Sequence, residues 1–321
     1  MKILKKPLII LTGPTAVGKT KLSIELAKAV NGEIISADSM QVYKHMDIGS
    51  AKIKKEEMCG VPHHLIDVLE PDEEFHVVRF QEMAKQAMEE IYAKGKVPIL
   101  AGGTGFYIQA VVKDIDFSKE TEKSPVREEL EKLAEEKGCE YLHERLQQVD
   151  PKSAEKIHAN NVKRVIRALE YFELTRKPIS LHNEEEAAKE SPYNVAYFVL
   201  NDVRERLYER IDARVDAMLQ EGLVEEVSGL AKKGYTKDMV SMQGLGYKEI
   251  LSYLDGSYTL DEAVYILKRD TRHFAKRQLT WFKREKDVIW VNKQDFHYEE
   301  NEILNYILEN CEKRGILSCR K

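Results

Sequence analysis

The chain has 321 residues, enough for one large domain or two smaller ones, and its 43% hydrophobic and 33% charged content is typical of a globular protein. A formal net charge of −5 argues against a protein that coats nucleic acid indiscriminately. No apolar run approaches the roughly 20 residues that a membrane-spanning helix needs, which argues against a membrane protein.

The cysteines and the first residues indicate the compartment. Met1 and Lys2 lead directly into a predicted strand, which leaves no room for a signal peptide. The cysteines are far apart and show no C-x-x-C spacing, so we expect reduced thiols in a cytoplasmic protein, with neither a disulfide framework nor a metal site. These cysteines are Cys59, Cys139, Cys311 and Cys319.

The first predicted strand, Leu8–Thr12, runs straight into the pattern G-x-x-x-x-G-K-T, and a predicted helix over Thr20–Val30 follows. Glycines in such a loop let successive backbone N–H groups point at one spot, where the positive end of the helix dipole also lies. Lys19 adds a point charge there, and the Thr20 hydroxyl is placed to ligate Mg²⁺. The pattern predicts a diphosphate site but does not say whether the phosphates belong to a nucleotide. The predicted binding residues are Gly13, Pro14, Thr15, Ala16, Val17, Gly18, Lys19 and Thr20.

A second predicted strand, Glu33–Ser36, places Asp38 at the edge of the sheet beside the phosphate loop. A carboxylate at this position has three interpretations, which the residues alone leave open. It can ligate Mg²⁺ directly or through water, act as a general base, or cap the next turn. Ser39 and Gln41 add a hydroxyl and an amide that suit recognition of a base edge.

A helical pattern over Val77–Lys94 leads into a third strand, Val97–Ala101, and then into the glycine-rich turn Gly102–Gly105, which allows close backbone approach and offers a hydroxyl. The alternation predicts a parallel sheet with helices on both faces, so the loops after the three strands should meet in one crevice. The third strand has no Asp at its end, which a nucleotide-hydrolysing phosphate loop would need, and this favours a transferase.

His63 and His64 are adjacent, so in a strand they would point to opposite faces. We therefore expect them to pack or form hydrogen bonds rather than bind a metal.

Composition changes between about Phe117 and Glu190, where the chain is charged and rich in helical patterns. Ser124-Pro125 is a helix start signal, and Asp150-Pro151 and Lys177-Pro178 divide the segment. Strand character returns at Asn194–Leu200. We predict a helical insertion domain over residues 117–193, set into an α/β core made of residues 1–116 and 194–321.

The last part of the chain predicts helices over Arg204–Glu221 and Leu223–Lys233, a turn into a short helix at Ser241–Tyr247, a basic helix after Leu260 and a final strand at Val288–Val291. Basic residues cluster over positions 268–286 and again around positions 163–167. Either cluster alone is consistent with a solvated surface. Two clusters on an acidic chain favour a polyanionic partner.

Eight blocks of the sequence resemble bacterial tRNA dimethylallyltransferases, and they occur in the same order along nearly the whole chain. The blocks are Gly13–Thr20, Ser36–Tyr43, Met46–Lys52, His63–Asp67, Gly102–Tyr107, Arg164–Glu170, Gln243–Glu249 and Ala275–Phe282. The resemblance implies a P-loop NTPase-like core with a helical insertion that grips a tRNA anticodon arm. It also implies transfer of a dimethylallyl group from its diphosphate to N6 of the adenosine at tRNA position 37.

The same resemblance assigns roles to residues of this chain. Lys19 and a Mg²⁺ ion on Thr20 would stabilise the diphosphate, Asp38 would orient the adenine amine and accept its proton, and Thr104 would lie near the adenine. The implied partners are dimethylallyl diphosphate and the tRNA anticodon stem-loop, and nothing demands a second subunit, so we expect a monomer. The implied tRNA contacts are Asp38, Ser39, Met40, Gln41, Thr104, Arg127, Lys163, Arg164 and Arg167.

Two other classes of function remain open at this point. A small-molecule kinase or an adenylate isopentenyltransferase could use the same scaffold, although neither should need a large helical insertion with basic clusters. An RNA-binding NTP switch is the second alternative, and the missing strand-end Asp argues against it.

Overall fold

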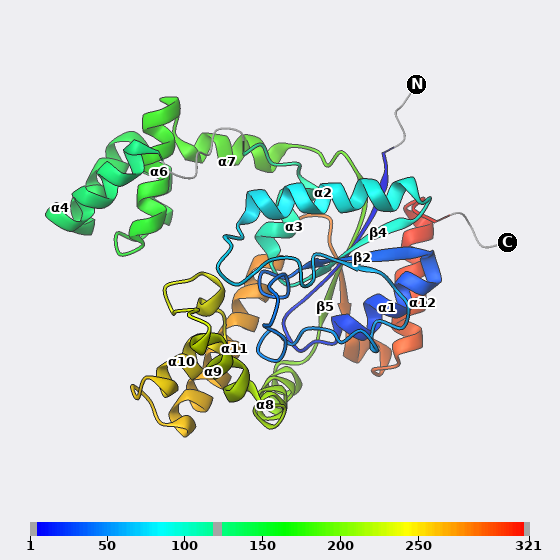
Figure 1. The fold of residues 1–321 in the computed structure, drawn as a ribbon. Helices are drawn as coiled ribbons and strands as arrows, with labels where there is room; N and C mark the ends of the chain where they lie inside the picture. The colour runs from blue at the N-terminus through cyan, green and yellow to red at the C-terminus, as the bar shows by residue number, and fades with distance from the viewer. Residues whose placement is uncertain (1–4, 118–123, 318–321) are drawn as a thin grey trace. The chain divides into compact units, whose positions relative to one another are not determined.

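The computed structural model describes residues 5–117 and 124–317, and the chain divides into two compact units. The larger unit takes in residues 1–112 and 192–321, and the smaller one takes in residues 113–191 (Figure 1). Cys59, Cys139 and Cys311 are free thiols. The expectations for Cys319 and for the first two residues concern positions outside the described ranges. In those ranges, no helix has both the length and the apolar character needed to cross a bilayer.

The larger unit is built on a six-stranded parallel sheet with the order β3-β2-β4-β1-β5-β6. The strands predicted from the sequence are confirmed, with each end within about one residue of its expected position, because apolar runs between turn residues mark buried strands well. The strands are β1 (Pro7–Thr12), β2 (Gly32–Ala37), β3 (His63–His64), β4 (Val97–Gly102), β5 (Asn194–Asn201) and β6 (Ile289–Asn292).

Helices cover both faces of this sheet, as the alternation of strands and helices predicts (Figure 1). The expected helices are confirmed, but two others, α3 and α12, were missed. Helix α3 is short and almost wholly apolar, so it has no amphipathic period to detect. The helices of this unit are α1 (Lys19–Val30), α2 (Val77–Ala93), α3 (Gly105–Val112), α8 (Arg204–Gln220), α9 (Leu223–Lys232), α10 (Tyr247–Leu254), α11 (Leu260–Phe282) and α12 (Glu300–Lys313), with short 3₁₀ turns at Ser241–Gln243 and Lys293–Phe296.

Strand β1 lies at the centre of the core and is buried on both faces, as expected for a parallel strand with helices on each side. Ile9 and Leu11 pack in one apolar cluster with residues of α1, α8 and α12. Leu8 and Ile10 alternate with them and therefore face the opposite side of the sheet, where α2 packs on β2 and β4. This central strand carries the phosphate loop at its carboxyl end.

The register brings the carboxyl ends of β1, β2 and β4 level with one another. Thr12 pairs with Gly102, and Gly102 pairs with Ala37 on its other side. The Thr12 Oγ1 donates a hydrogen bond to the Gly102 carbonyl at 2.7 Å, and the Thr104 N–H donates to the Ala37 carbonyl at 3.1 Å. The loops that follow these strands therefore leave the sheet at one edge.

The smaller unit is helical and has a core of its own. Ser124 caps the first helix by accepting a hydrogen bond from the Arg127 N–H, and Asp150 ends that helix and caps the next, as their sequence signals predict. Gly138, with φ 84° and ψ 169°, interrupts the first helix. The helices are α4 (Pro125–Val149), α5 (Pro151–Lys156), α6 (Val162–Thr175) and α7 (Ile179–Ala188). Their shared core contains Leu130, Leu142, Leu146, Val165, Ile166, Leu169 and Ile179.

Candidate active site

A cavity of about 280 Å³ opens at the carboxyl edge of the sheet, and the three loops expected to converge there all contribute to its lining. Helices α8 and α11 supply further lining residues that the sequence did not single out. The lining includes Thr15, Gly18, Lys19, Thr20, Asp38, Gln41, His63, Gly103, Arg214 and Gln278. The cavity therefore joins a loop of phosphate-binding type to an acidic loop.

The phosphate loop has the backbone shape that an anion site needs. Gly18 stands immediately before α1 with φ 99°, a left-handed conformation that favours glycine, and no side chain caps the helix there. The first N–H groups of α1 thus remain directed at the loop, where the helix dipole is positive. The geometry is that of an anion-binding helix N-terminus.

Lys19 lies inside this loop, where its Nζ donates to the carbonyl oxygens of Gly13 at 3.0 Å and Pro14 at 2.8 Å. Burial and, to a smaller extent, the charge of Arg214 lower the pKa of Lys19, the charge of Asp38 opposes them, and the net result is a pKa of about 7. An anion bound in the loop would favour the protonated form. Lys19 is therefore a cation whose charge responds to the arrival of a phosphate.

Arg214 is the cavity residue that sequence reasoning most clearly missed. It lies on α8, and burial together with the nearby charge of Arg210 lowers its pKa. Lys293 Nζ and Arg210 Nη2 lie just beneath the loop, where they would stand 3.3 and 3.4 Å from a Cβ added to Gly18. A weak signal was present, because Arg206, Arg210 and Arg214 recur every four residues and so share one face of α8.

The basic cluster at positions 268–286, all described by the structure, contributes no cation to the cavity lining. Members of this cluster form intramolecular ion pairs instead: Arg272 with Asp212 at 2.6 Å, Lys268 with Asp216 at 2.6 Å and Arg269 with Asp270 at 2.8 Å. The cations of the lining come instead from the start of α1, with Lys19 and Lys21, and from α8, with Arg214.

Asp38 caps a turn and also lines the cavity. Its Oδ1 accepts hydrogen bonds from the backbone N–H groups of Met40 at 2.8 Å and Gln41 at 3.4 Å. Its Oδ2 makes no hydrogen bond within residues 5–117 and 124–317. The capping interpretation thus accounts for one carboxylate oxygen, and the second remains for a substrate or a metal-bound water.

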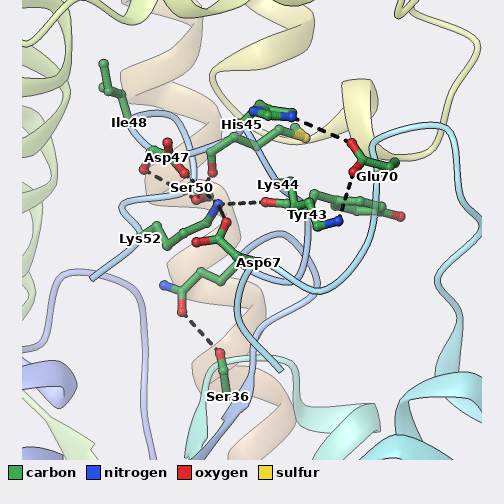
Figure 2. Close-up of polar contacts among 12 residues, drawn as sticks. Ser36, Tyr43, Lys44, His45, Asp47, Ile48, Ser50, Lys52, Asp67 and Glu70 are labelled. Atoms are coloured by element: carbon green, nitrogen blue, oxygen red, sulfur yellow. Dashed lines mark hydrogen bonds and ion pairs between the residues drawn. The ribbon is translucent and has the colours of Figure 1, made fainter. Parts of the chain in front are cut away.

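The segment after Asp38 is held in place from two sides. The Nζ of Lys52, whose side chain is only 3% exposed, donates to the Tyr43 carbonyl at 2.6 Å, to Asp47 Oδ1 at 2.6 Å and to Asp67 Oδ1 at 2.5 Å (Figure 2). The Asp67 carboxylate is thus bound by a buried lysine.

The second support of this segment comes from α9. The Glu226 carboxylate accepts hydrogen bonds from three successive backbone N–H groups, those of Asp47, Ile48 and Gly49, at 2.9, 2.8 and 3.1 Å. It also accepts from the Tyr247 hydroxyl at 2.8 Å. Residues 38–52 are therefore a fixed wall of the site rather than a loose loop.

The two histidines make hydrogen bonds, as the sequence suggested, but one of them also belongs to the cavity. His64 Nε2 lies 2.8 Å from Glu33 Oε2, and His63 Nδ1 lies 2.8 Å from the Val61 carbonyl. His63 lines the cavity, and burial lowers its pKa. No signal in the sequence separated it from an ordinary structural histidine.

Thr104 lies at the start of α3, where its carbonyl accepts from the N–H groups of Tyr107 at 3.0 Å and Ile108 at 3.2 Å. The cavity lining includes its neighbour Gly103 but not Thr104 itself. A contact between Thr104 and a base therefore requires the base to extend beyond the 280 Å³ cavity.

The candidate tRNA residues of the smaller unit differ in their surroundings. Arg127 Nη2 lies 2.5 Å from Glu170 Oε2, so this guanidinium ties α4 to α6. Lys163 and Arg164 are exposed in the first turn of α6, and Arg167 is half-buried. The exposed pair is best placed to meet a phosphate backbone.

Two oxygen donors in the cavity suit a Mg²⁺ ion. The Thr20 hydroxyl and the Asp38 carboxylate both belong to its lining. Mg²⁺ in nucleotide and diphosphate sites binds through one or two protein oxygens, with the remaining positions taken by substrate phosphates and water. The residues present therefore fit the ion.

Comparison with known proteins finds relatives of this chain along nearly its full length. Residues 41–285 match the family model described as IPP transferase. The tRNA dimethylallyltransferase of Lachnoclostridium phytofermentans is 67% identical over 292 residues, which cover 91% of this chain and 93% of that protein. The tRNA dimethylallyltransferase of Acetivibrio thermocellus is 56% identical over 297 residues, which cover 92% and 95%.

Solved structures of related proteins resemble this chain over nearly its full length. A tRNA isopentenylpyrophosphate transferase from Bacillus halodurans is 46% identical and superposes with a TM-score of 0.73, covering 97% of this chain and 98% of that one. A eukaryotic dimethylallyltransferase acting on tRNA is 29% identical with a TM-score of 0.79, covering 98% and 86%. The expected P-loop NTPase-like sheet with flanking helices is confirmed. The chain belongs to the IPP transferase family.

Proposed function

We propose that this chain is a tRNA dimethylallyltransferase, which transfers a dimethylallyl group from dimethylallyl diphosphate to N6 of the adenosine at tRNA position 37. The products are N6-isopentenyladenosine in the tRNA and diphosphate. The curated relatives at 67% and 56% identity carry this activity in their names. The single structural observation that supports it best is that Lys19, Arg214 and Asp38 line one cavity.

The phosphate loop, Gly13–Thr20, would hold the diphosphate. Negative charge grows on the leaving oxygen as its bond to carbon breaks, and Lys19 and Arg214 are placed to stabilise that charge in a partly buried setting. Thr20, with Asp38 through water, would hold a Mg²⁺ ion against the same phosphates. When bound, this ion supplies further neutralisation of the leaving group.

Asp38 would act on the acceptor, the N6 amine of the adenosine. The N6 nitrogen forms a bond to the allylic carbon, the carbon–oxygen bond breaks, and its electron pair leaves with the diphosphate. The proton lost from N6 passes to Asp38, whose Oδ2 has no other hydrogen bond within the described ranges. Ser39, Met40, Gln41 and Thr104 would contact the tRNA around the extruded base.

Residues 117–193 would serve as the tRNA-binding insertion, and residues 1–116 and 194–321 as the catalytic core. Exposed Lys163 and Arg164 would contact phosphates of the anticodon arm, and Arg167 and Arg127 would make further contacts with the tRNA. No further subunit is needed to complete the cavity, so we propose a monomer that works with tRNA in the cytoplasm.

Purified protein with Mg²⁺ and labelled dimethylallyl diphosphate, offered unmodified tRNA or AMP, tests this proposal. We expect label in tRNA at the adenosine 3′ of the anticodon, together with an equal amount of released diphosphate. Label in AMP but not in tRNA would make the protein an adenylate isopentenyltransferase. ATP hydrolysis coupled to RNA binding without prenyl transfer would make it an NTP switch.

A further inference from the structure

One side chain bridges two walls of the cavity that come from distant parts of the sequence. Gln278 of α11 accepts a hydrogen bond from the Thr15 N–H through Oε1 at 2.8 Å, and it donates from Nε2 to the Gly103 carbonyl at 3.0 Å. The residue is 7% exposed and lines the cavity. The phosphate loop and the glycine turn are thus joined through a single carboxamide.

The two hydrogen-bond partners, the Thr15 N–H and the Gly103 carbonyl, explain why residue 278 is a glutamine. An N–H needs an acceptor and a carbonyl needs a donor, and a carboxamide is a neutral group that offers both. A glutamate could still accept from Thr15 but would set a carboxylate against the Gly103 carbonyl. Gly103 has no Cβ, and a Cβ there would overlap Gln278 Nε2, so the turn approaches the amide as closely as the hydrogen bond requires.

The bridge lies between the two groups that must react. On one side is the loop that holds the diphosphate, and on the other is the turn that leads to Thr104 and faces Asp38 across the strand ends. Transfer between two bound groups depends steeply on their separation, and an error of about 1 Å can cost about a hundredfold in rate. The spacing of the two walls therefore bears directly on turnover.

We propose that Gln278 is a positioning residue that sets the distance between the diphosphate loop and the acceptor side of the cavity. It acts through the backbone of Thr15 and Gly103 and need not touch a reacting atom. The N–H groups at the start of α1 remain to bind the diphosphate, so the bridge governs the rate of transfer more than the affinity for either substrate. This inference rests on the proposed prenyl transfer.

A comparison of two glutamines tests the proposal. Gln278→Leu removes both hydrogen bonds. Gln81→Leu is the matched control, because Gln81 is also a buried glutamine, 6% exposed, whose Nε2 donates to the Ala110 carbonyl at 2.7 Å, but it does not line the cavity. Each variant leaves a buried backbone carbonyl without its amide partner, so we expect similar losses of melting temperature.

The kinetics should separate them. We expect kcat to fall about 30- to 100-fold in Gln278→Leu and to stay within about twofold in Gln81→Leu, below the melting transitions. KM for dimethylallyl diphosphate and Kd for inorganic diphosphate, measured by calorimetry, should change less than about threefold in both. Gln278→Glu, which keeps the bond from Thr15, should lose about tenfold in kcat and gives the test if Gln278→Leu does not fold.

Two results would overturn the proposal while leaving prenyl transfer intact. One is a Gln278→Leu enzyme with kcat within about threefold of wild type and a melting temperature as low as that of Gln81→Leu, which would make Gln278 merely structural. The other is a large loss of diphosphate affinity at unchanged kcat, which would make it a binding residue. A wild-type protein that transfers no prenyl group to tRNA would instead refute the proposed function.

Discussion

The two units use charge in opposite ways. In the larger unit, Lys19 and Arg214 are cations whose pKa values burial lowers, and they lie in one cavity with Asp38. In the smaller unit, Lys163 and Arg164 are exposed on the first turn of a helix. Buried charges act strongly on nearby chemistry, whereas exposed charges are screened and act on a polyanion through counterion release. Mutations at the cavity of the larger unit should therefore lower kcat, whereas mutations at the exposed pair of the smaller unit should raise the KM for tRNA.

The largest effect is expected at Asp38. Asp38→Asn keeps an oxygen that can cap the Met40 and Gln41 N–H groups but removes the base. We expect turnover to fall about a hundredfold or more, with tRNA affinity within about tenfold of wild type. Asp38→Ala, which loses the cap as well, is the control for the turn. Unchanged turnover in Asp38→Asn would remove Asp38 from proton transfer.

Lys19 should take up a proton when diphosphate binds. Its pKa of about 7 means that it is mostly neutral at pH 8, so diphosphate binding should draw in close to one proton there and much less below pH 6. Calorimetry in two buffers of different ionisation heat measures this uptake. Lys19→Met should abolish the difference and weaken diphosphate binding about 10- to 100-fold. Equal uptake in Lys19→Met and wild type would contradict the assignment.

The sign of the stability effect at Lys19 follows from the same pKa. The lowered pKa means that the unfolded chain binds more protons between about pH 7 and 10.5. The residue therefore costs stability most fully below pH 7, and the cost disappears as the pH rises toward 10.5.

Lys163 and Arg164 should change binding rather than chemistry. We expect the double alanine variant to raise the KM for tRNA about three- to tenfold and to reduce the slope of log affinity against log salt by about 1 to 2. Its kcat should stay near wild type. Lys28→Ala removes an exposed, ion-paired cation from the last turn of α1 and serves as the control. A salt slope equal to that of wild type would argue that this turn does not meet the tRNA backbone.

The smallest effect on activity is expected at the amino end of β2. Glu33 is 1% exposed and lies within 3.0 Å of Lys96, His64 and Lys94. Burial alone would raise its pKa, but the hydrogen bonds from Lys96, His64 and Lys94 outweigh burial and hold the pKa at about 2. A lowered pKa gives stability that is present above the ordinary value of 4.5 and is lost as the pH falls toward 2.

We therefore expect Glu33→Gln to lose about 3 kcal/mol of unfolding free energy at pH 7, with the deficit shrinking below pH 4, and to keep its kcat. Denaturant unfolding at several pH values measures this loss. A deficit that does not change with pH would mean that the charge of Glu33 is not what stabilises this edge of the sheet.

Sequence patterns predicted the features of this molecule that contiguous residues form. The strands, the phosphate loop and the position of Asp38 follow from apolar runs, turn residues and glycines that are contiguous in the sequence. Arg214 and Gln278 reach the cavity from α8 and α11, and only tertiary packing decides which face of each helix is turned inward. The same cause explains the basic cluster on α11, where Arg272 and Lys268 turn to aspartates of α8. A helix pattern shows that such residues share a face but not what that face meets.

Single-turnover transfer at saturating enzyme and tRNA separates the role of Asp38 in chemistry from the role of Lys163 and Arg164 in binding most directly. When enzyme saturated with tRNA is mixed with a limiting amount of labelled dimethylallyl diphosphate, rapid quenching measures a single round of transfer. We expect Asp38→Asn to slow this step about a hundredfold or more, and the Lys163/Arg164 double variant to match wild type once it is saturated with tRNA. A normal rate in Asp38→Asn would contradict its role as the base, and a slow step in the saturated double variant would contradict a role of Lys163 and Arg164 in binding alone.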